Sequence, residues 1–335
     1  MAIQLILDSP GVKLSRQQLL FEIRYQDERR TVHPDQVQQI LLSRGVLLTS
    51  DALLLALEQQ IDLILLDRRG YPVGRLWNHR FGSIATVRRQ QLRFAPSRTA
   101  MEWVRDWVLL KIRTQTAFLY QVSYARPEGP PPETQKALKA LERIQRQLLR
   151  HRVVMPEVFG ASLRGWEGTA SRLYFENLSQ ALPPLYRFEA RSRRPARDYF
   201  NCALNYLYGV LYASVESALI KAGLDPAIGI WHADEYNKPV LSFDFIEPYR
   251  VWADQIAFRL CQQYALGPAD VVAHQEGLWL AGSGKRRVIQ AFNDFLDEVV
   301  PWQGRRRSRQ THIQLDAHAF AQKILKWEET MNSGQ

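Results

Sequence analysis

The sequence predicts an α+β protein of several domains, with a small, β-rich, sandwich-like domain at the N-terminus and a larger all-α domain after it. The chain has 335 residues, more than one ordinary domain needs, and 46% of them are hydrophobic, which is enough to bury real cores. Its apolar residues form short runs before about residue 85 and long helical repeats after about residue 95. This change in pattern predicts two domains of different class.

Residues 1–85 have the pattern of short strands separated by turns. Their apolar runs end at Gly, Pro or charged pairs, which are strand and turn signals. Ser50 and Asp51 precede the run LLLALEQQ and predict one short helix capped at this pair. The predicted strands lie within 2–8, 12–26, 37–49, 61–67 and 73–77.

We expect residues 86–98 to link the two domains and residues 99–335 to form the helical domain. In its first long segment, Trp103, Trp107 and Leu110 share one helical face by their spacing. Pro-rich and Gly-containing breaks separate this segment from the next ones. Helices are predicted at 97–121, 133–152, 167–180, 196–222, 248–265, 285–299 and 315–331.

The positive charge lies almost entirely outside the β-rich segment. The chain carries a formal net charge of +10 and has a pI near 9.7. Residues 1–85 hold ten basic and nine acidic side chains, so residues 86–335 carry a net +9. A basic surface attracts polyanions and lets Lys and Arg replace the counterions of phosphate. Nucleic-acid binding is therefore modestly favoured over simple solubility, and the basic run 304–309 fits a phosphate contact or a solvated loop.

Cys202 and Cys261 are the only cysteines in the sequence. They exclude a disulfide framework and a cysteine-based zinc site, and they fit a reducing cytosol. Both lie in apolar helical segments, where packed core thiols are expected. The N-terminus lacks the pattern of a signal peptide, and no apolar run approaches the ~18 residues of a membrane helix. We therefore expect a soluble, cytoplasmic protein with no membrane partner.

The segment GSGK at 282–285 superficially suggests a phosphate-binding loop. A Walker A loop needs an upstream Gly at a fixed spacing and Ser or Thr after the lysine. Trp279 and Arg286 occupy those two positions. A polar turn that caps a helix starting near Lys285 is the preferred interpretation.

The residues that could carry chemistry lie between 164 and 250. Glu167 stands among apolar and small residues, where a helix-start charge also explains it. The segment AIGIWHADEYNKPVLSFDF predicts a hairpin that folds His232 back towards Asp244 and Glu247. Burying a histidine and two acids in an apolar hairpin is costly unless their charges and hydrogen bonds are satisfied. A His–Asp pair that bridges the hairpin would satisfy them, and so would a metal ion. Carboxylates with one imidazole suit Mn²⁺ or Mg²⁺ better than zinc.

Four segments, none of which is diagnostic alone, together form a specific sequence pattern. They are EGTASRLYF (Glu167 to Phe175), RPARDYFNCAL (Arg194 to Leu204), GLDPAIGIWH (Gly223 to His232) and DFIEPYR (Asp244 to Arg250). In order, spacing and domain plan they resemble the CRISPR-associated adaptation endonuclease/integrase family, the universal first Cas protein. The resemblance covers nearly the whole chain. Cys202 stands where the family often has Ala, and Arg197 replaces a usual Pro.

The resemblance implies a metal site and an activity. Glu167, His232 and Glu247 would ligate Mn²⁺ or Mg²⁺, with Asp244 close by as an auxiliary catalytic acid. The family's activity is metal-dependent phosphodiester transfer, in which the 3′-hydroxyl ends of a short DNA attack the repeat boundary of a CRISPR array. The resemblance also implies homodimers formed through the β-rich domain and bridged by a second Cas adaptation protein.

Four residues are expected to contact DNA phosphates: Arg172, just past Glu167, and Arg194, Arg197 and Asn201 near the next helix. Ordinary surface charges explain the arginines equally well. Two other functions stay open at this point. One is a stand-alone metal-dependent nuclease that processes branched DNA, and the other is a non-catalytic DNA-binding scaffold.

Overall fold

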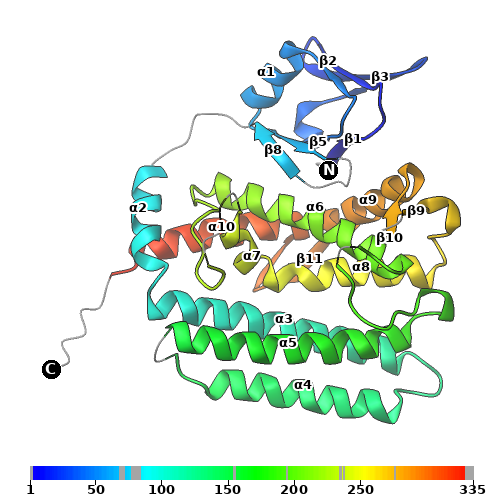
Figure 1. The fold of residues 1–335 in the computed structure, drawn as a ribbon. Coiled ribbons are helices and arrows are strands. Elements are labelled where there is room, and N and C mark those ends of the chain that lie inside the picture. The colour runs from blue at the N-terminus through cyan, green and yellow to red at the C-terminus, as the bar shows by residue number, and fades with distance from the viewer. Residues whose placement is uncertain are drawn as a thin grey trace. The chain divides into compact units, whose positions relative to one another are not determined.

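The computed structural model describes residues 3–67, 72–76, 84–153, 156–193, 195–233, 236, 238–274 and 277–328. A β-rich N-terminal region is followed by a larger helical region (Figure 1), which confirms the predicted fold class. The chain divides into two compact units. The first comprises Met1–Gly82, Pro268–Val272 and Trp279–His312, and the second comprises Ser83–Gly267, Ala273–Leu278 and Ile313–Gln335.

Two four-stranded sheets make up the N-terminal part of the first unit. One has the order β1-β5-β7-β8, with only its last pair antiparallel, and the other has the order β4-β3-β2-β6, with only its last pair parallel. The strands are β1 (Ile3–Leu7), β2 (Lys13–Gln17), β3 (Leu20–Tyr25), β4 (Glu28–Val32), β5 (Val37–Leu42), β6 (Leu47–Leu48), β7 (Asp62–Leu66) and β8 (Pro72–Leu76). The short 3₁₀ helix η1 (Pro34–Gln36) precedes β5.

One hydrophobic core joins both sheets to helix α1 (Ser50–Glu58). Leu14 and Phe21 reach it from one sheet, and Ile40 and Leu63 reach it from the other. Two sheets that share one apolar core form a sandwich-like arrangement, as the alternating pattern predicted. Helix α1 is capped by the Thr49 hydroxyl, one residue before the predicted cap.

Two short hairpins interrupt the segment that was expected to be all-α. They consist of β9 (Val271–His274) with β10 (Gly277–Leu280), and β11 (Val299–Trp302) with β12 (Arg305–Ser308). The second hairpin turns at Gln303 and Gly304, which have positive φ angles of 47° and 78°. Segment 99–335 is therefore not wholly helical, because strands of four residues are too short to show a clear period.

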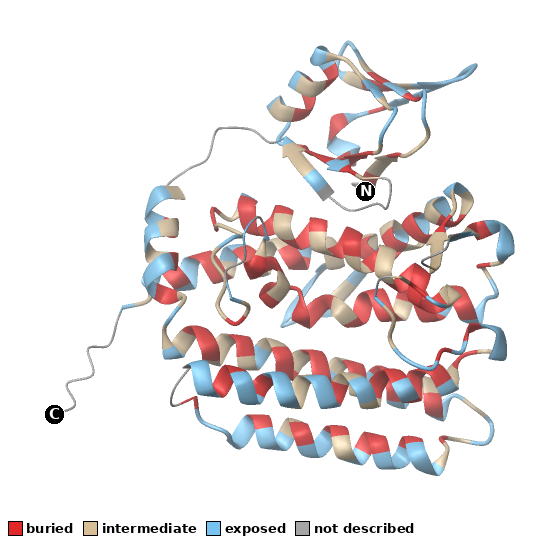
Figure 2. Ribbon diagram, viewed as in Figure 1, coloured by how far each residue is buried: buried red, intermediate tan, exposed pale blue. Residues whose placement is uncertain are grey.

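Long helices form the second unit, and α3, α4 and α5 pack against one another in it (Figure 1). Helix α4 exposes one face, whereas α6 is buried around most of its surface (Figure 2). No helix among the described residues is long and apolar enough to cross a membrane. The helices are α2 (Ile84–Phe94), α3 (Arg98–Tyr124), α4 (Pro132–Arg150), α5 (Pro156–Ala181), η2 (Pro184–Tyr186), α6 (Tyr199–Lys221), α7 (Val240–Phe245), η3 (Glu247–Tyr249), α8 (Arg250–Gln262), η4 (Pro268–Asp270), α9 (Gly282–Asp297) and α10 (Arg309–Lys326), of which η4 and α9 belong to the first unit.

The segment expected to be a linker, 86–98, is mostly helix α2. Its Gln91 side chain donates to the Asp225 carbonyl oxygen and accepts the Asp225 N–H, each at 2.9 Å. Phe94 packs edge-on against Trp327, with ring centroids 5.5 Å apart. Helix α2 is therefore an integral part of the helical unit. The sequence pattern concealed it because its buried face carries a glutamine between two apolar residues.

Helix α3 buries a different face from the one that the spacing predicted. Trp103, Trp107 and Leu110 are only partly buried, whereas Val108 and Lys111 are buried. A lysine on the inner face breaks the apolar period, which shifted the prediction towards the tryptophans. This rotation brings Lys111 into the interior of the helical unit.

Both cysteines are free and buried, which confirms the prediction of packed core thiols. Burial raises the pKa of the Cys202 thiol to about 12. A thiol with so high a pKa is protonated and unreactive at neutral pH. Both cysteines are therefore core residues in this structure.

Gly284 has no room for a side chain, which explains one glycine of the GSGK segment. Helix α9 begins at Gly282, and a Cβ on Gly284 would lie 2.2 Å from the Asp270 carbonyl oxygen. We predict that Gly284→Ala destabilises the protein by about 1–3 kcal/mol through overpacking. Gly282→Ala is the matched control, because its Cβ would meet only the end of Arg286, at 3.5 Å. Equal thermal unfolding of both variants would contradict this reading.

Candidate active site

Three side chains from distant parts of the sequence meet inside the helical unit. Lys111 of α3 donates from Nζ to Glu247 Oε2 at 2.7 Å, and it also donates to Glu167 Oε1. Glu167 lies on α5, and Glu247 is the first residue of η3. The side chains of Lys111 and Glu247 are 5% and 4% exposed, whereas that of Glu167 is 23% exposed. Solvent therefore reaches the cluster from the Glu167 side.

Each carboxylate has further hydrogen bonds that fix its orientation. Ser171, one turn after Glu167 on α5, donates its hydroxyl to Glu167 Oε1 at 2.7 Å. Arg250 donates from Nε to Glu247 Oε1 at 2.6 Å and from its terminal nitrogen to the Tyr212 hydroxyl at 2.6 Å. The two acids are therefore held by different elements around one shared cation.

The cations keep both acids ionised despite their burial. Burial opposes the charge of Glu247, but Arg250 and then Lys111 outweigh it and lower its pKa to about 2. Burial likewise opposes the charge of Glu167, and Lys111 outweighs it, so that this pKa also lies below its ordinary value. Two carboxylates and two cations thus balance to zero net charge in a site of low polarity.

The pair of His232 and Asp244 lies in a second cluster. His232 Nδ1 is 2.6 Å from Asp244 Oδ1, and the Asp244 side chain is 0% exposed against 41% for His232. Asp244 also accepts the backbone N–H groups of residues 230, 231 and 232, at 2.8, 3.1 and 3.2 Å. Four donors on one carboxylate fix both the loop and the imidazole.

The predicted hairpin around His232 is wrong, although the contact that it was meant to explain is present. Residues 227–232 form no strand, and VLSFDF forms helix α7. A short apolar run does not distinguish a strand from a buried helix. The loop closes tightly instead, because a Cβ on Gly229 would lie 2.4 Å from the His232 carbonyl oxygen.

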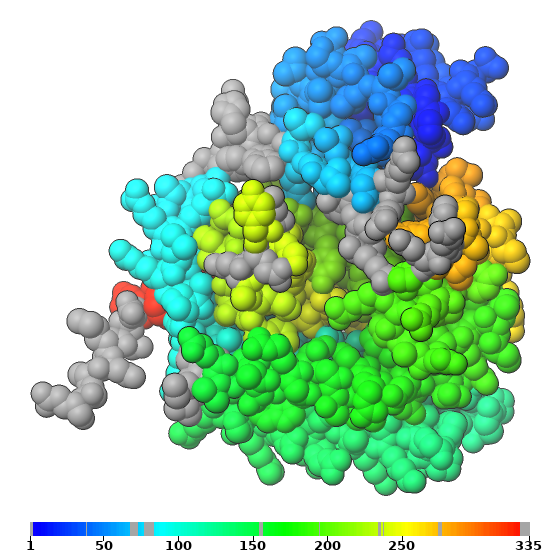
Figure 3. Space-filling model, in the orientation of Figure 1, coloured from blue at the N-terminus to red at the C-terminus, as the bar shows by residue number. Residues whose placement is uncertain are grey.

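The loop at His232 packs on the helix that carries Glu167. The Trp231 indole donates to the Gly160 carbonyl oxygen of α5 at 3.0 Å. Figure 3 shows this segment beside α5 on one face of the surface. On its other side, His232 contacts Phe243, which in turn contacts Tyr212, with centroids 5.8 and 5.4 Å apart. Both clusters therefore belong to one region of the helical unit.

The four predicted catalytic residues thus form two pairs in this structure, Glu167 with Glu247 through Lys111 and His232 with Asp244. Among the residues that the structure describes, no three His, Cys, Asp or Glu side chains are grouped so as to hold a metal ion. The donor chemistry nevertheless fits a hard divalent cation, since carboxylate oxygens with one imidazole suit Mn²⁺ or Mg²⁺. The Lys111 ammonium also shows that Glu167 and Glu247 can share one cation. By donor type and by their sharing of one cation, Glu167 and Glu247 therefore suit such a metal.

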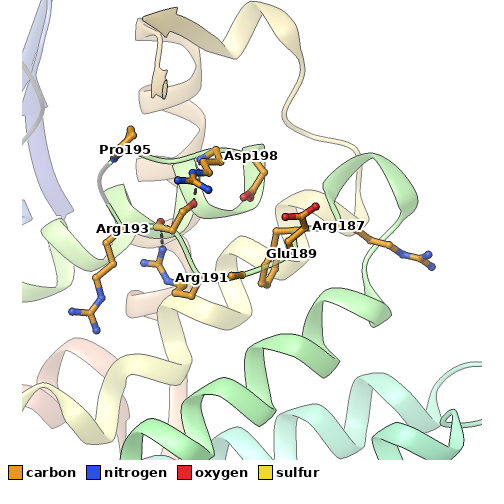
Figure 4. Close-up of a pocket in the computed structure, with 10 residues that line it drawn as sticks. Arg187, Glu189, Arg191, Arg193, Pro195 and Asp198 are labelled. Atoms are coloured by element: carbon orange, nitrogen blue, oxygen red, sulfur yellow. Dashed lines mark hydrogen bonds between the residues drawn. The ribbon is translucent and has the colours of Figure 1, made fainter. Parts of the chain in front are cut away.

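An arginine-rich pocket of about 490 Å³ opens before helix α6 (Figure 4). Arg187 and Arg193 lie at opposite ends of it in Figure 4, with Arg191 between them. The Arg191 guanidinium is fixed by the side-chain oxygens of Asn201 and Asn205, both at 2.7 Å. The pocket is lined by Arg187, Phe188, Glu189, Ala190, Arg191, Ser192, Arg193, Pro195, Arg197 and Asp198.

The structure places the predicted DNA contacts in different settings. Arg197 is exposed and lines the pocket. Asn201 is buried. Its side-chain NH₂ donates to Asp198 and to the Ala190 carbonyl oxygen, and its side-chain oxygen accepts from Arg191, so it orients Arg191 and does not face solvent. Arg172 is exposed and pairs with Glu176. Arg194 lies outside the described residues.

Sequence reasoning missed the cations that connect these features. Arg191 and Arg250 both lie over the Tyr208 ring, 5.5 and 5.2 Å from its centroid. Tyr208 therefore joins the pocket to the acid pair. Arg250 ends one of the four recognised segments, which could have revealed it. Lys111 lies in none of these segments, and it is not on the face of α3 that the sequence spacing predicted.

Comparisons with known proteins decide the family. The family model described as CRISPR associated protein Cas1 matches residues 5–294. The chain belongs to the Cas1 family. A Cas1 endonuclease of Archaeoglobus fulgidus is 29% identical, over 94% of this chain and 94% of its own length. Another, from Thermus thermophilus, is 31% identical, over 79% of this chain and 77% of its own length.

Solved structures share the Cas1 fold along nearly the whole chain. A Cas1 protein from Thermotoga maritima superposes with a TM-score of 0.78 and 20% identity, covering 99% of this chain and all of that one. A casposase bound to its integration product superposes with a TM-score of 0.81 and 19% identity, covering 98% of this chain and 92% of that one. At such low identity these likenesses establish the fold alone.

Because of its hydrogen bonds, Asp244 should contribute more to the stability of this Cas1 chain than its partner His232 does. Asp244→Ala would leave three backbone N–H groups without their acceptor, and we predict a loss of at least about 2 kcal/mol of stability. His232→Ala removes a half-exposed ring and is expected to cost less than about 1 kcal/mol. Chemical denaturation of both variants measures the difference. Similar losses would show that Asp244 does not organise the loop.

Proposed function

We propose that this protein is a metal-dependent DNA endonuclease and integrase, which inserts short DNA fragments as new spacers into a CRISPR array by phosphodiester transfer. The observation that carries the proposal is the pair of Glu167 and Glu247, held around one cation position and joined to an arginine-rich pocket. Membership of the Cas1 family supports it, since the relatives compared above are named endonucleases.

Each cluster has a role in this proposal. Glu167, Glu247 and His232 would hold Mn²⁺ or Mg²⁺, which when bound polarises phosphate oxygens and stabilises developing charge. Asp244 keeps the His232 ring oriented through its Nδ1 contact, which leaves Nε2 for a ligand. The arginines of the pocket would bind DNA phosphates, which position a duplex without reading its sequence.

The proposed partners are DNA, a second copy of the chain and a second Cas adaptation protein. We expect the β-rich domain to form the homodimer. One structural neighbour, with a TM-score of 0.76 and 21% identity over 96% of this chain, was solved as part of a Cas6-RT-Cas1–Cas2 complex. That assembly supports the choice of Cas2 as the partner to test here.

Replacing each acid by its amide tests the role of the negative charge while keeping the side-chain volume. We predict that Glu167→Gln and Glu247→Gln retain DNA binding but lose strand transfer in Mn²⁺ or Mg²⁺ by about 10²-fold or more. Glutamine is preferred to alanine because alanine at 247 would remove both hydrogen-bond acceptors that Lys111 and Arg250 share there and would leave a cavity. Glu176→Gln, at an exposed position of the same helix, is the matched control with the same change of charge. Full activity of Glu167→Gln would refute the metal site.

Integration of a labelled short duplex into a plasmid with a CRISPR repeat tests the reaction itself. Products joined at the repeat boundary, dependent on a divalent metal and increased by Cas2, are expected. Cleavage of branched DNA without joined products, with or without Cas2, would instead identify a stand-alone nuclease. DNA binding without any product under either metal would identify a scaffold.

The pocket arginines make a separate prediction about affinity. Arg193→Ala and Arg197→Ala should each weaken DNA binding and reduce the slope of log K against log salt by about one. Arg146→Ala, at an exposed position of α4 outside the pocket, removes the same charge and should change binding less. Binding measured by fluorescence anisotropy across salt concentrations decides the matter. Equal effects at all three positions would remove the pocket from the DNA-binding surface.

A further inference from the structure

Lys111 lies at the position where a cation shared by Glu167 and Glu247 has to lie. Its side chain is 5% exposed, and its Nζ contacts one oxygen of each acid. Lysine is almost never buried unless it is paired, and here both of its acidic partners are expected metal ligands. A lysine in this position therefore affects any other cation that approaches the same oxygens.

Both oxygens of Glu247 already have a cationic partner. Arg250 donates to Glu247 Oε1 at 2.6 Å and Lys111 donates to Oε2 at 2.7 Å, while Lys111 and the Ser171 hydroxyl both donate to Glu167 Oε1. A divalent ion that joins both acids therefore competes with the ammonium group for Glu247 Oε2. Keeping Lys111 in place as well would add two positive charges to a buried cluster that is already neutral, which is costly at low polarity.

We propose that Lys111 is the resident counter-cation of the site, which holds the two acids together in the metal-free protein and competes with the divalent metal for them. This inference rests on the proposed metal-dependent function. It makes metal affinity a balance between two cations, and it assigns Lys111 a positioning role when no metal is bound.

A second buried carboxylate is available to the displaced ammonium group. Asp254, on α8 one turn after Arg250, is 0% exposed. It accepts hydrogen bonds from the neutral Tyr208 hydroxyl at 2.7 Å and from the Gln115 amide at 3.2 Å. Gln115 stands one turn after Lys111 on the buried face of α3. Asp254 therefore lies against the buried face of α3 that also carries Lys111, and it is the carboxylate that would receive the displaced ammonium group.

Binding of Mn²⁺ alone to the whole chain, without DNA, tests the competition. Electron paramagnetic resonance of unbound Mn²⁺ gives the affinity, and thermal unfolding gives the stabilisation by the ion. Lys111→Met should bind Mn²⁺ at least about tenfold more tightly than the unchanged protein, with a larger rise in Tm on addition of Mn²⁺. Lys111→Arg should not bind more tightly, because it keeps the cation. Lys139→Met, at an exposed position of α4, controls for net charge.

The outcomes separate this inference from the proposed function. If the unchanged protein binds no Mn²⁺, the metal-dependent function fails. If it binds Mn²⁺ and Glu167→Gln weakens that binding, but Lys111→Met binds no more tightly, only the competition by Lys111 is overturned. Should Lys111→Met fail to fold, a crystal structure of the Mn²⁺-loaded unchanged protein decides instead. Lys111 Nζ should then have left the two acids, and an Nζ still bonded to both would refute the proposal.

Discussion

The helical unit depends on neutralising two carboxylates, of which its packing buries one and partly buries the other. Glu167 and Glu247 come from α5 and η3, and α3 reaches between them with Lys111. A buried carboxylate without a cation is among the most costly groups in a protein interior. The ion pairs therefore link α3, α5 and η3 at one point. The same arrangement presents two oxygen donors to one cation, which is the chemical requirement for a divalent metal site.

The second organising group is Asp244, which accepts hydrogen bonds from the backbone of the loop at His232. By accepting three N–H groups and contacting the imidazole, it shapes a loop that has no regular hydrogen bonding of its own. The loop is also closely packed, since a Cβ on Gly229 would clash with the His232 carbonyl oxygen. A half-exposed histidine is thereby held at the surface of the helical unit, beside α5. Rigid support of this kind lets a ligand keep its orientation before anything binds.

Arginines extend the polar network from the acids to the surface. Arg250 bonds Glu247 and stacks over Tyr208, while Arg191 lies over the same ring and lines the pocket. Aromatic faces attract guanidinium groups, so Tyr208 stabilises two cations that would otherwise repel each other. Asparagine side chains fix Arg191 without cancelling its charge. The pocket therefore keeps a positive field next to the acidic cluster, as a site for a polyanion requires.

The sequence by itself determined the fold class, the buried state of the cysteines and the contact of His232 with Asp244. These follow from local pattern, because hydrophobic period and short-range spacing are readable along the chain. The sequence misjudged the linker 86–98, the face of α3 and the local structure around His232. In each case a polar residue or a short run obscured the period.

Only the tertiary structure decided that Lys111 joins Glu167 to Glu247 and that Arg191 and Arg250 share one aromatic ring. Nothing in the local pattern marks these contacts, since they arise between elements far apart in sequence. Family resemblance could bring Glu167 into the site by analogy with known members. The cation that neutralises it is Lys111 on the inner face of α3, which only the packing of the helices defines, because a buried charge needs a partner of opposite sign.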